Sequence, residues 1–160
     1  MKTVICYASK SGTARECAKK LKTLLSDAVL CDIEKEKATL SEYDCIVVGG
    51  SIRMGKLHKA TANFIAKNKE LLKEKKCAFF ICNGFPEQAE TFLVQNIGQE
   101  LLENSLCAAS FGGKIDLDNL KGMDKFIAKA VINSAKGDVN ALPKIQEESI
   151  KEFADVINNQ

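Results

Sequence analysis

Residues 3–14 read TVICYASKSGTA, an apolar run that passes without a break into small hydroxyl residues and one glycine. The apolar part predicts a strand buried on both faces, because a half-solvated strand would alternate apolar with polar residues. This strand should end at Ser9. Beyond it, apolar residues recur at the spacing of one face of a helix; they are Ala14, Cys17, Ala18, Leu21, Leu24 and Leu25. The stretch therefore predicts a strand, a short loop and a helix in direct succession.

The loop between this strand and this helix predicts a binding site for an anion. The first N–H groups of a helix have no partner within it, and the helix dipole favours negative charge at that end. A phosphate group is the natural ligand, and the expected contacts are Ser9, Lys10, Ser11, Gly12, Thr13 and Ala14. The simpler alternative is a capped turn without a ligand, with Thr13 as the N-cap.

Three common phosphate loops are excluded by the letters of this loop. A Walker loop needs GxxxxGK[ST], and a dinucleotide fingerprint needs GxGxxG, but the loop has only Gly12. A C-x5-R phosphatase loop would begin at Cys6, and its arginine position is Gly12. The pattern hydroxyl-x-hydroxyl-Gly-hydroxyl at Ser9, Ser11, Gly12 and Thr13 resembles the FMN phosphate loop of the flavodoxins instead. Ala14 departs from that family, which usually has Thr or Ser there.

Length and composition predict a single domain over residues 1–160. The chain has 160 residues, 46% of them hydrophobic, which is enough for a core without disulfides or metal. Its apolar stretches are far shorter than the roughly 20 residues of a membrane span, and no signal peptide is evident at the N-terminus, which favours a cytoplasmic protein. The net charge of +2 is too small to indicate nucleic-acid binding, although flavodoxins are usually strongly acidic.

The seven cysteines indicate neither a metal site nor a redox dithiol, because the chain has no CxxC and a single histidine. A disulfide framework is not expected in this setting. Six cysteines fall in predicted strands, where a reduced cysteine packs as a small apolar residue; they are Cys6, Cys31, Cys45, Cys77, Cys82 and Cys107.

The rest of the chain alternates strands with amphipathic helices. Further strands are expected at 28–33, 44–51, 77–83 and 106–113, and further helices at 60–74, 92–101, 119–135 and 143–158. Alternation of this kind predicts right-handed crossovers around a parallel sheet. Five strands and five helices match the α/β flavodoxin-like fold, a doubly wound five-stranded sheet of order 2-1-3-4-5 with helices on both faces. In this fold, of which flavodoxin is the familiar instance, the ligand lies where the loops after strands 1, 3 and 4 converge.

The loop after the third strand, GGSIRMGKLHK at 49–59, is expected to contact a flat ligand. Its glycine pair would let the backbone approach closely, and a methionine offers a polarizable surface to a ring. The Met-Gly pair resembles the turn with which some short-chain flavodoxins cover the isoalloxazine and bond its N5. The expected contacts are Ser51, Ile52, Arg53, Met54 and Gly55. Residues 51–65 and 111–132 also resemble the flavodoxin-like menaquinone-dependent protoporphyrinogen oxidases.

The loop NGFPEQ at 83–88 is the third expected wall of the site. Asn83 and Gly84 can supply amide contacts to the pyrimidine edge of a flavin, and Phe85 could shield a ring face or fill the core instead. The protoporphyrinogen oxidases of this type carry a longer basic segment here, whereas this chain has Glu87 and Glu90. Weak or absent protoporphyrinogen oxidation is therefore expected.

No catalytic residue and no metal ligand is indicated. Cys82 is expected to be a buried small residue, and His58 to open the following helix at the surface rather than to donate protons. In the helix expected at 119–135, an apolar stripe opposes several lysines, and this helix either closes the sheet or contacts a membrane that holds a quinone. The stripe consists of Leu120, Met123, Phe126, Ile127, Ala130 and Val131.

Two functions remain open at the level of sequence. The first is an FMN-binding flavodoxin-like protein that carries electrons between redox partner proteins. The second is an FMN-dependent oxidoreductase of the menaquinone-dependent protoporphyrinogen oxidase or quinone reductase type. In both, the flavin performs the chemistry and the three loops tune it.

Overall fold

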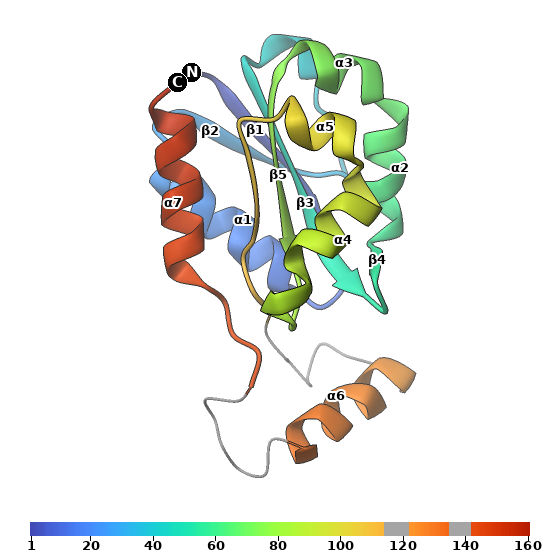
Figure 1. Ribbon diagram of the computed structural model, residues 1–160. Coiled ribbons are helices and arrows are strands. Elements are labelled where there is room, and N and C mark those ends of the chain that lie inside the picture. The colour runs from blue at the N-terminus through green and yellow to red at the C-terminus, as the bar shows by residue number, and fades with distance from the viewer. Residues whose placement is uncertain (114–121, 135–141) are drawn as a thin grey trace.

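Five parallel strands form the centre of the protein (Figure 1). The structure is a computed structural model that describes residues 1–113, 122–134 and 142–160. The order of the strands in the sheet is β2-β1-β3-β5-β6. Their bounds are Thr3–Ala8 for β1, Ala28–Asp32 for β2, Cys45–Arg53 for β3, Lys76–Cys82 for β5 and Cys107–Ser110 for β6. The predicted order 2-1-3-4-5 is confirmed, with β5 and β6 as the fourth and fifth strands of the parallel sheet.

Helices cover both faces of this sheet (Figure 1). One face is covered by α1 (Thr13–Leu24) and α7 (Glu147–Asn158), and the other by α2 (Lys59–Lys67), α3 (Lys69–Glu74), α4 (Ala89–Ile97) and α5 (Gln99–Glu103). Two short 3-10 turns, η1 (Leu40–Glu42) and η2 (Pro86–Gln88), complete the connections. The two described chain ends lie side by side at the amino edge of β1.

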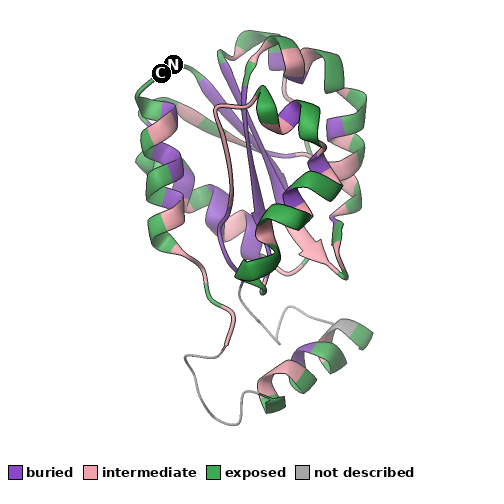
Figure 2. Ribbon diagram, in the orientation of Figure 1, coloured by how far each residue is buried: buried purple, intermediate pink, exposed green. Residues whose placement is uncertain are grey.

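The three central strands, β1, β3 and β5, are buried on both sides over most of their length, as their unbroken apolar sequences predict (Figure 2). In β1, Ile5 and Tyr7 belong to the core under α1 and α7, whereas Val4 and Cys6 belong to the core under α2 to α5. On the first face, Phe111 stacks on Phe80 at 4.7 Å between ring centroids and meets the edge of Phe153 at 5.1 Å. The six cysteines predicted in strands do lie in strands, and all seven are free thiols.

Two of the predicted helices are each broken in two. The helix expected at 60–74 is interrupted at Asn68, where φ is −111° and the side-chain amide donates to the Phe64 carbonyl at 2.8 Å. The helix expected at 92–101 is interrupted at Gly98, which has φ of +94°. Apolar periodicity continues across both breaks, so it hides them. Leu24, expected on the inner face of α1, is 40% exposed and is the last residue of that helix.

The segment predicted as the loop 49–59 is mostly strand. β3 continues through Arg53, and β4 (Lys56–Leu57) pairs with it antiparallel, with Ile52 opposite Leu57 and Arg53 opposite Lys56. The turn between them consists of Met54 and Gly55, with φ of +49° and +74°. Two left-handed residues are the requirement of a tight hairpin turn whose twist matches its strands. The predicted loop is therefore a hairpin that extends the sheet beyond its carboxyl edge.

The helix expected at 119–135 does not close the sheet. Its described part, α6 (Gly122–Ser134), lies beyond the carboxyl ends of the strands, and α7 takes the place against β6 (Figure 1). Met123 and Phe126 of its predicted stripe are 76% and 74% exposed. Leu120, also assigned to that stripe, lies outside the described residues. Within the described ranges, no helix combines the length and apolar character that crossing a membrane requires.

Candidate functional site

A cavity of about 580 Å³ opens at the carboxyl ends of the strands, within the usual size range of sites for small ligands. It lies between the loops after β1, β3 and β5, with α6 across from them. The predicted site residues that line it are Lys10, Ser11, Thr13, Ser51, Ile52, Arg53, Met54, Asn83, Gly84 and Phe85. Ser9, Gly12, Ala14 and Gly55 do not line it. The convergence of the three loops follows from the strand order, which reverses between β1 and β3.

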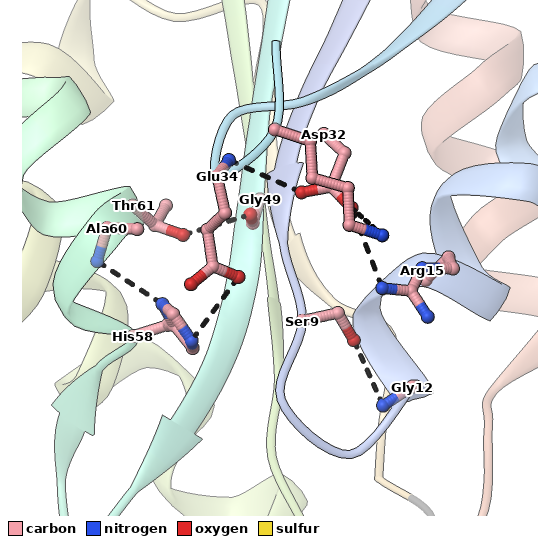
Figure 3. Close-up of polar contacts among 10 residues, drawn as sticks. Ser9, Gly12, Arg15, Asp32, Glu34, Gly49, His58, Ala60 and Thr61 are labelled. Atoms are coloured by element: carbon pink, nitrogen blue, oxygen red, sulfur yellow. Dashed lines mark hydrogen bonds and ion pairs between the residues drawn. The ribbon is translucent and has the colours of Figure 1, made fainter.

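The loop after β1 is held in shape by its own residues (Figure 3). The Ser9 hydroxyl accepts a hydrogen bond from the Gly12 N–H at 3.1 Å. Gly12 is the N-cap of α1 with φ of +97°, a conformation that costs a residue with a side chain about 1–2 kcal/mol. The alternative with Thr13 as N-cap is wrong, since Thr13 is the first residue of the helix itself. A glycine cap leaves the start of the helix open to an external anion.

Ala14 takes no side-chain part in this site. It is completely buried and packs in the core with Cys17 and Ala18, under the first turn of α1. The Ser11 and Thr13 hydroxyl oxygens lie 3.5 Å apart, and both residues line the cavity. They are therefore the two hydroxyl residues of this loop that reach it.

The β3–β4 hairpin is fixed by an asparagine, Asn96, that was not among the predicted site residues. The Asn96 side chain in α4 accepts from the Leu57 N–H at 2.8 Å and donates to the Gly55 carbonyl at 3.0 Å and to the Phe92 carbonyl at 2.9 Å. Asn96 thus satisfies one donor on the outer strand of the hairpin and one acceptor in its turn. Because 39 residues separate it from Leu57, no local pattern could have identified it.

The glycine pair that begins this segment does not serve the ligand. A side chain at Gly49 would overlap the Phe80 ring, and a Cβ at Gly50 would lie 2.6 Å from the Thr61 hydroxyl. Thr61 is buried and donates to the Gly49 carbonyl at 3.4 Å. The two glycines therefore make room for the protein's own core, and the expectation that they admit a flat ligand is wrong.

Ser51, immediately after this pair, carries an unused polar group. Its hydroxyl is buried and, within the described parts of the chain, has no hydrogen-bonding partner. The residue lines the cavity at the point where β3 leaves the core. A buried hydroxyl without a partner costs free energy, so Ser51 is a residue to which a polar atom of a ligand could supply the missing hydrogen bond.

The loop after β5 is fixed to the loop after β6. The Asn83 side chain donates to the Phe85 carbonyl at 2.6 Å and accepts from the Ser110 hydroxyl, which in turn accepts from the Gly112 N–H at 3.1 Å. With its side-chain amide engaged in this way, the Asn83 loop offers chiefly its backbone to a ligand. Phe85 is 52% exposed, so its alternative as a core residue is wrong.

His58 opens α2, as predicted, and it also contacts an acidic residue (Figure 3). Its Nδ1 accepts from the Ala60 N–H at 3.2 Å, so the ring's hydrogen lies on Nε2, which is 3.9 Å from a carboxylate oxygen of Glu34.

Nearby, Asp32 is buried and lies 3.5 Å from both Arg15 and Lys35. Burial and the Asp32 charge together raise the pKa of Tyr7 beside them.

Cys82, which lines the cavity and is the remaining candidate for covalent chemistry there, is unreactive. A hydrogen bond with Cys17 and complete burial raise the pKa of Cys82 well above that of a free thiol. It is therefore held as the thiol, which is a poor nucleophile. Within the described ranges, no group of three or more His, Cys, Asp or Glu residues is arranged to hold a metal ion.

Comparison with known proteins points to one family. A family model described as a flavodoxin domain matches residues 4–141. Protoporphyrinogen IX dehydrogenase [quinone] of Escherichia coli K12 is 26% identical over 157 residues, which cover 91% of this chain and 86% of the relative.

Solved structures share the fold. Oxidised flavodoxin 2 of Bacillus cereus has a TM-score of 0.57 at 20% identity and covers 99% of both chains. A Lactobacillus acidophilus flavoprotein in complex with FMN has a TM-score of 0.54 at 16% identity, over 68% of this chain and 92% of that one. The resemblance predicted from residues 9–13 and from the Met-Gly turn is thereby confirmed at the level of family and fold.

Proposed function

We propose, because the chain belongs to the flavodoxin domain family, that it is a single-domain FMN protein that carries electrons between redox partners. The observation that carries the proposal is the cavity itself, which joins the start of α1, lined by Ser11 and Thr13, to the buried Ser51 hydroxyl, which has no partner among the described residues. The first feature suits a phosphate, and the second suits a polar atom of a bound ring system. When bound, FMN supplies one-electron and two-electron transfer.

The chain's own residues would bind and orient this cofactor. The loop from Ser9 to Thr13 would hold the phosphate, and the hairpin at 51–55 and the loop at 83–85 would enclose the ring. FMN is expected rather than FAD or NAD, because one short loop provides one phosphate site and no GxGxxG provides a second.

The direct test is the visible spectrum of the purified protein, followed by titration of the stripped protein with FMN, FAD and NAD. We expect a yellow protein whose flavin is released by denaturation and runs as FMN in chromatography. A nucleotide-free protein that also fails to bind added FMN would refute the proposal.

The second candidate, an FMN-dependent oxidoreductase, is favoured by the relative named protoporphyrinogen IX dehydrogenase [quinone], most of whose length this chain covers. Turnover assays with quinones and with protoporphyrinogen IX distinguish the two candidates. We expect weak or absent protoporphyrinogen oxidation, since the exposed Glu87 and Glu90 follow the third loop where such oxidases carry basic residues, and a porphyrinogen bears carboxylates. Efficient turnover of that substrate would favour the enzyme.

A further inference from the structure

The cavity has an unusual distribution of charge. Its lining includes Lys10 in the phosphate loop and, on the wall formed by the hairpin and the start of α2, three further cations: Arg53, Lys56 and Lys59, here called the hairpin rim. Within the described residues, no aspartate or glutamate lines the cavity. Glu34, near the rim, lies against His58. One phosphate bound at the helix start would lie next to Lys10, whereas the three cations of the hairpin rim lie on another wall of the cavity.

The hairpin rim also flanks exposed apolar side chains. Met54 is 84% exposed at the tip of the hairpin, and Phe85 is 52% exposed on the loop after β5, and both line the cavity mouth. Methionine, aromatic residues and arginine are the residues enriched at protein interfaces, where charged groups at the edge guide the encounter. Lys56 and Lys59 are exposed and therefore suited to such guidance.

We propose that the hairpin rim, with Met54 and Phe85 at its centre, docks an acidic redox protein. The inference rests on the proposed function and specifies the partner of the same site. The partner would place a carboxylate-rich surface around its own redox centre, and long-range attraction would speed association at low salt. Contact at Met54 would place the partner at the edge of the cavity, next to any flavin bound there.

A pair of small oxidants measures the charge that an approaching partner meets. The reduced protein is mixed with hexacyanoferrate(III), an anion, or hexaammineruthenium(III), a cation, and each metal complex takes up one electron. The ratio of the two rate constants reports local charge, because a change in flavin potential affects both oxidants in the same direction. We compare the parent with Lys56→Gln/Lys59→Gln and with a matched control, Lys22→Gln/Lys67→Gln, whose lysines are exposed and do not line the cavity.

We expect the ratio of anion to cation rates to fall at least about tenfold in the rim variant at about 0.01 M salt, and much less at about 0.5 M, because salt screens the charges. The control should change the ratio about twofold or less. Equal changes in both variants would overturn the inference, because the effect would then reflect net charge alone.

A protein arm separates a docking surface from a site for a small anion. Two cytochromes are reduced by the flavoprotein, one with a carboxylate-rich haem edge and one with a lysine-rich haem edge. A faster reaction with the acidic cytochrome, lost in the rim variant, supports the inference. No preference for it overturns protein docking even if the small anion is favoured. Failure of the parent to bind FMN is detected first by absorbance, and it refutes the proposed function together with this inference.

Discussion

The two main walls of the cavity are built in different ways. The loop after β1 is closed by its own neighbours, since Ser9 and Gly12 bond to each other within four residues. The hairpin after β3 is instead held by Asn96 in a helix about 40 residues further along the chain. The first wall is therefore a local structure and the second a tertiary one. A substitution in the first wall should therefore disturb mainly the loop itself, whereas a substitution at Asn96 should disturb the hairpin from a distant part of the chain.

The largest effect is expected at the local wall, from Gly12→Val. A valine at φ of +97° would force the backbone out of the left-handed region and move the N–H groups that the proposed phosphate would contact. FMN binding should be abolished, while the free energy of unfolding should fall by only about 1–2 kcal/mol. Flavin fluorescence titration and thermal unfolding measure the two quantities.

Gly98→Val is the matched control for this change. Gly98 has nearly the same φ, +94°, and at both glycines an added Cβ meets no atom within 4 Å, but Gly98 lies between α4 and α5 away from the cavity. Because its ψ of +143° gives a backbone conformation that is essentially confined to glycine, we expect an equal or larger loss of stability, with FMN binding retained. Loss of binding in both variants would show that the loop matters only through overall stability.

Asn96→Ala tests the tertiary wall. It leaves the Leu57 N–H and the Gly55 carbonyl without their partner, which should cost about 1–3 kcal/mol. Because the loss is confined to the hairpin, trypsin should cleave faster after Arg53 and Lys56, and FMN should bind about tenfold more weakly. Proteolysis followed by mass spectrometry locates the cleavage.

Asn104→Ala provides the comparison for that experiment. Asn104 also donates to the carbonyl four residues before it, at 2.9 Å, but it is exposed at the end of α5 and makes no contact with the hairpin. It should leave both cleavage and FMN affinity unchanged. If Asn96→Ala behaves in the same way, the hairpin holds its position without α4, and the distinction between the two walls fails.

The same distinction explains what the sequence could predict. Hydroxyl residues and Gly12 stand next to one another in the chain, so the first loop, its helix and the strand order could be inferred from residues 3–14 and the alternation after them. The hairpin could not be inferred in this way, because the three glycines of GGSIRMGK look alike in the sequence but have different roles. Gly49 and Gly50 accommodate Phe80 and Thr61, and only Gly55 forms the turn. The role of each glycine depends on the distant side chains that pack against it, and the spacing of residues in the sequence does not reveal those contacts.

Ser51 lies where β3 passes from the core into the hairpin. Its replacement should have a smaller effect, and the change in stability of the FMN-free protein should be opposite in sign to that of the other variants. Ser51→Ala removes a buried hydroxyl that has no partner in the described protein, so the FMN-free protein should be unchanged or up to about 1 kcal/mol more stable. FMN should bind about fivefold more weakly and raise the melting temperature less. Ser105→Ala is the control, because its hydroxyl donates to the Leu102 carbonyl at 2.8 Å and its loss should destabilise both forms alike. Weaker stability of the FMN-free Ser51→Ala protein would indicate an internal partner for that hydroxyl.

A purely electrostatic effect concerns the charge that the hairpin brings to the cavity. Fully reduced flavin is anionic, so a nearby cation favours it and raises the potential of the second one-electron reduction. Lys56 lines the cavity but is exposed. A single charge at about 8 Å contributes roughly 2 kcal/mol at an effective dielectric of about 20, and roughly half that when solvent screens it. Reversal of the charge in Lys56→Glu should therefore lower this potential by about 80 mV at low salt.

Spectroelectrochemical titration at about 0.01 M and about 0.5 M salt measures the shift, which should shrink at the higher concentration because the Debye length falls from about 30 Å to a few ångströms. Lys67→Glu, the same change of charge at an exposed site that does not line the cavity, should shift the potential far less. An unchanged potential in Lys56→Glu at low salt would mean that the hairpin positions its backbone against the flavin without tuning it electrostatically. The difference between the walls would then be one of architecture alone, with the local loop supplying the charge-binding part of the site and the tertiary hairpin only its shape.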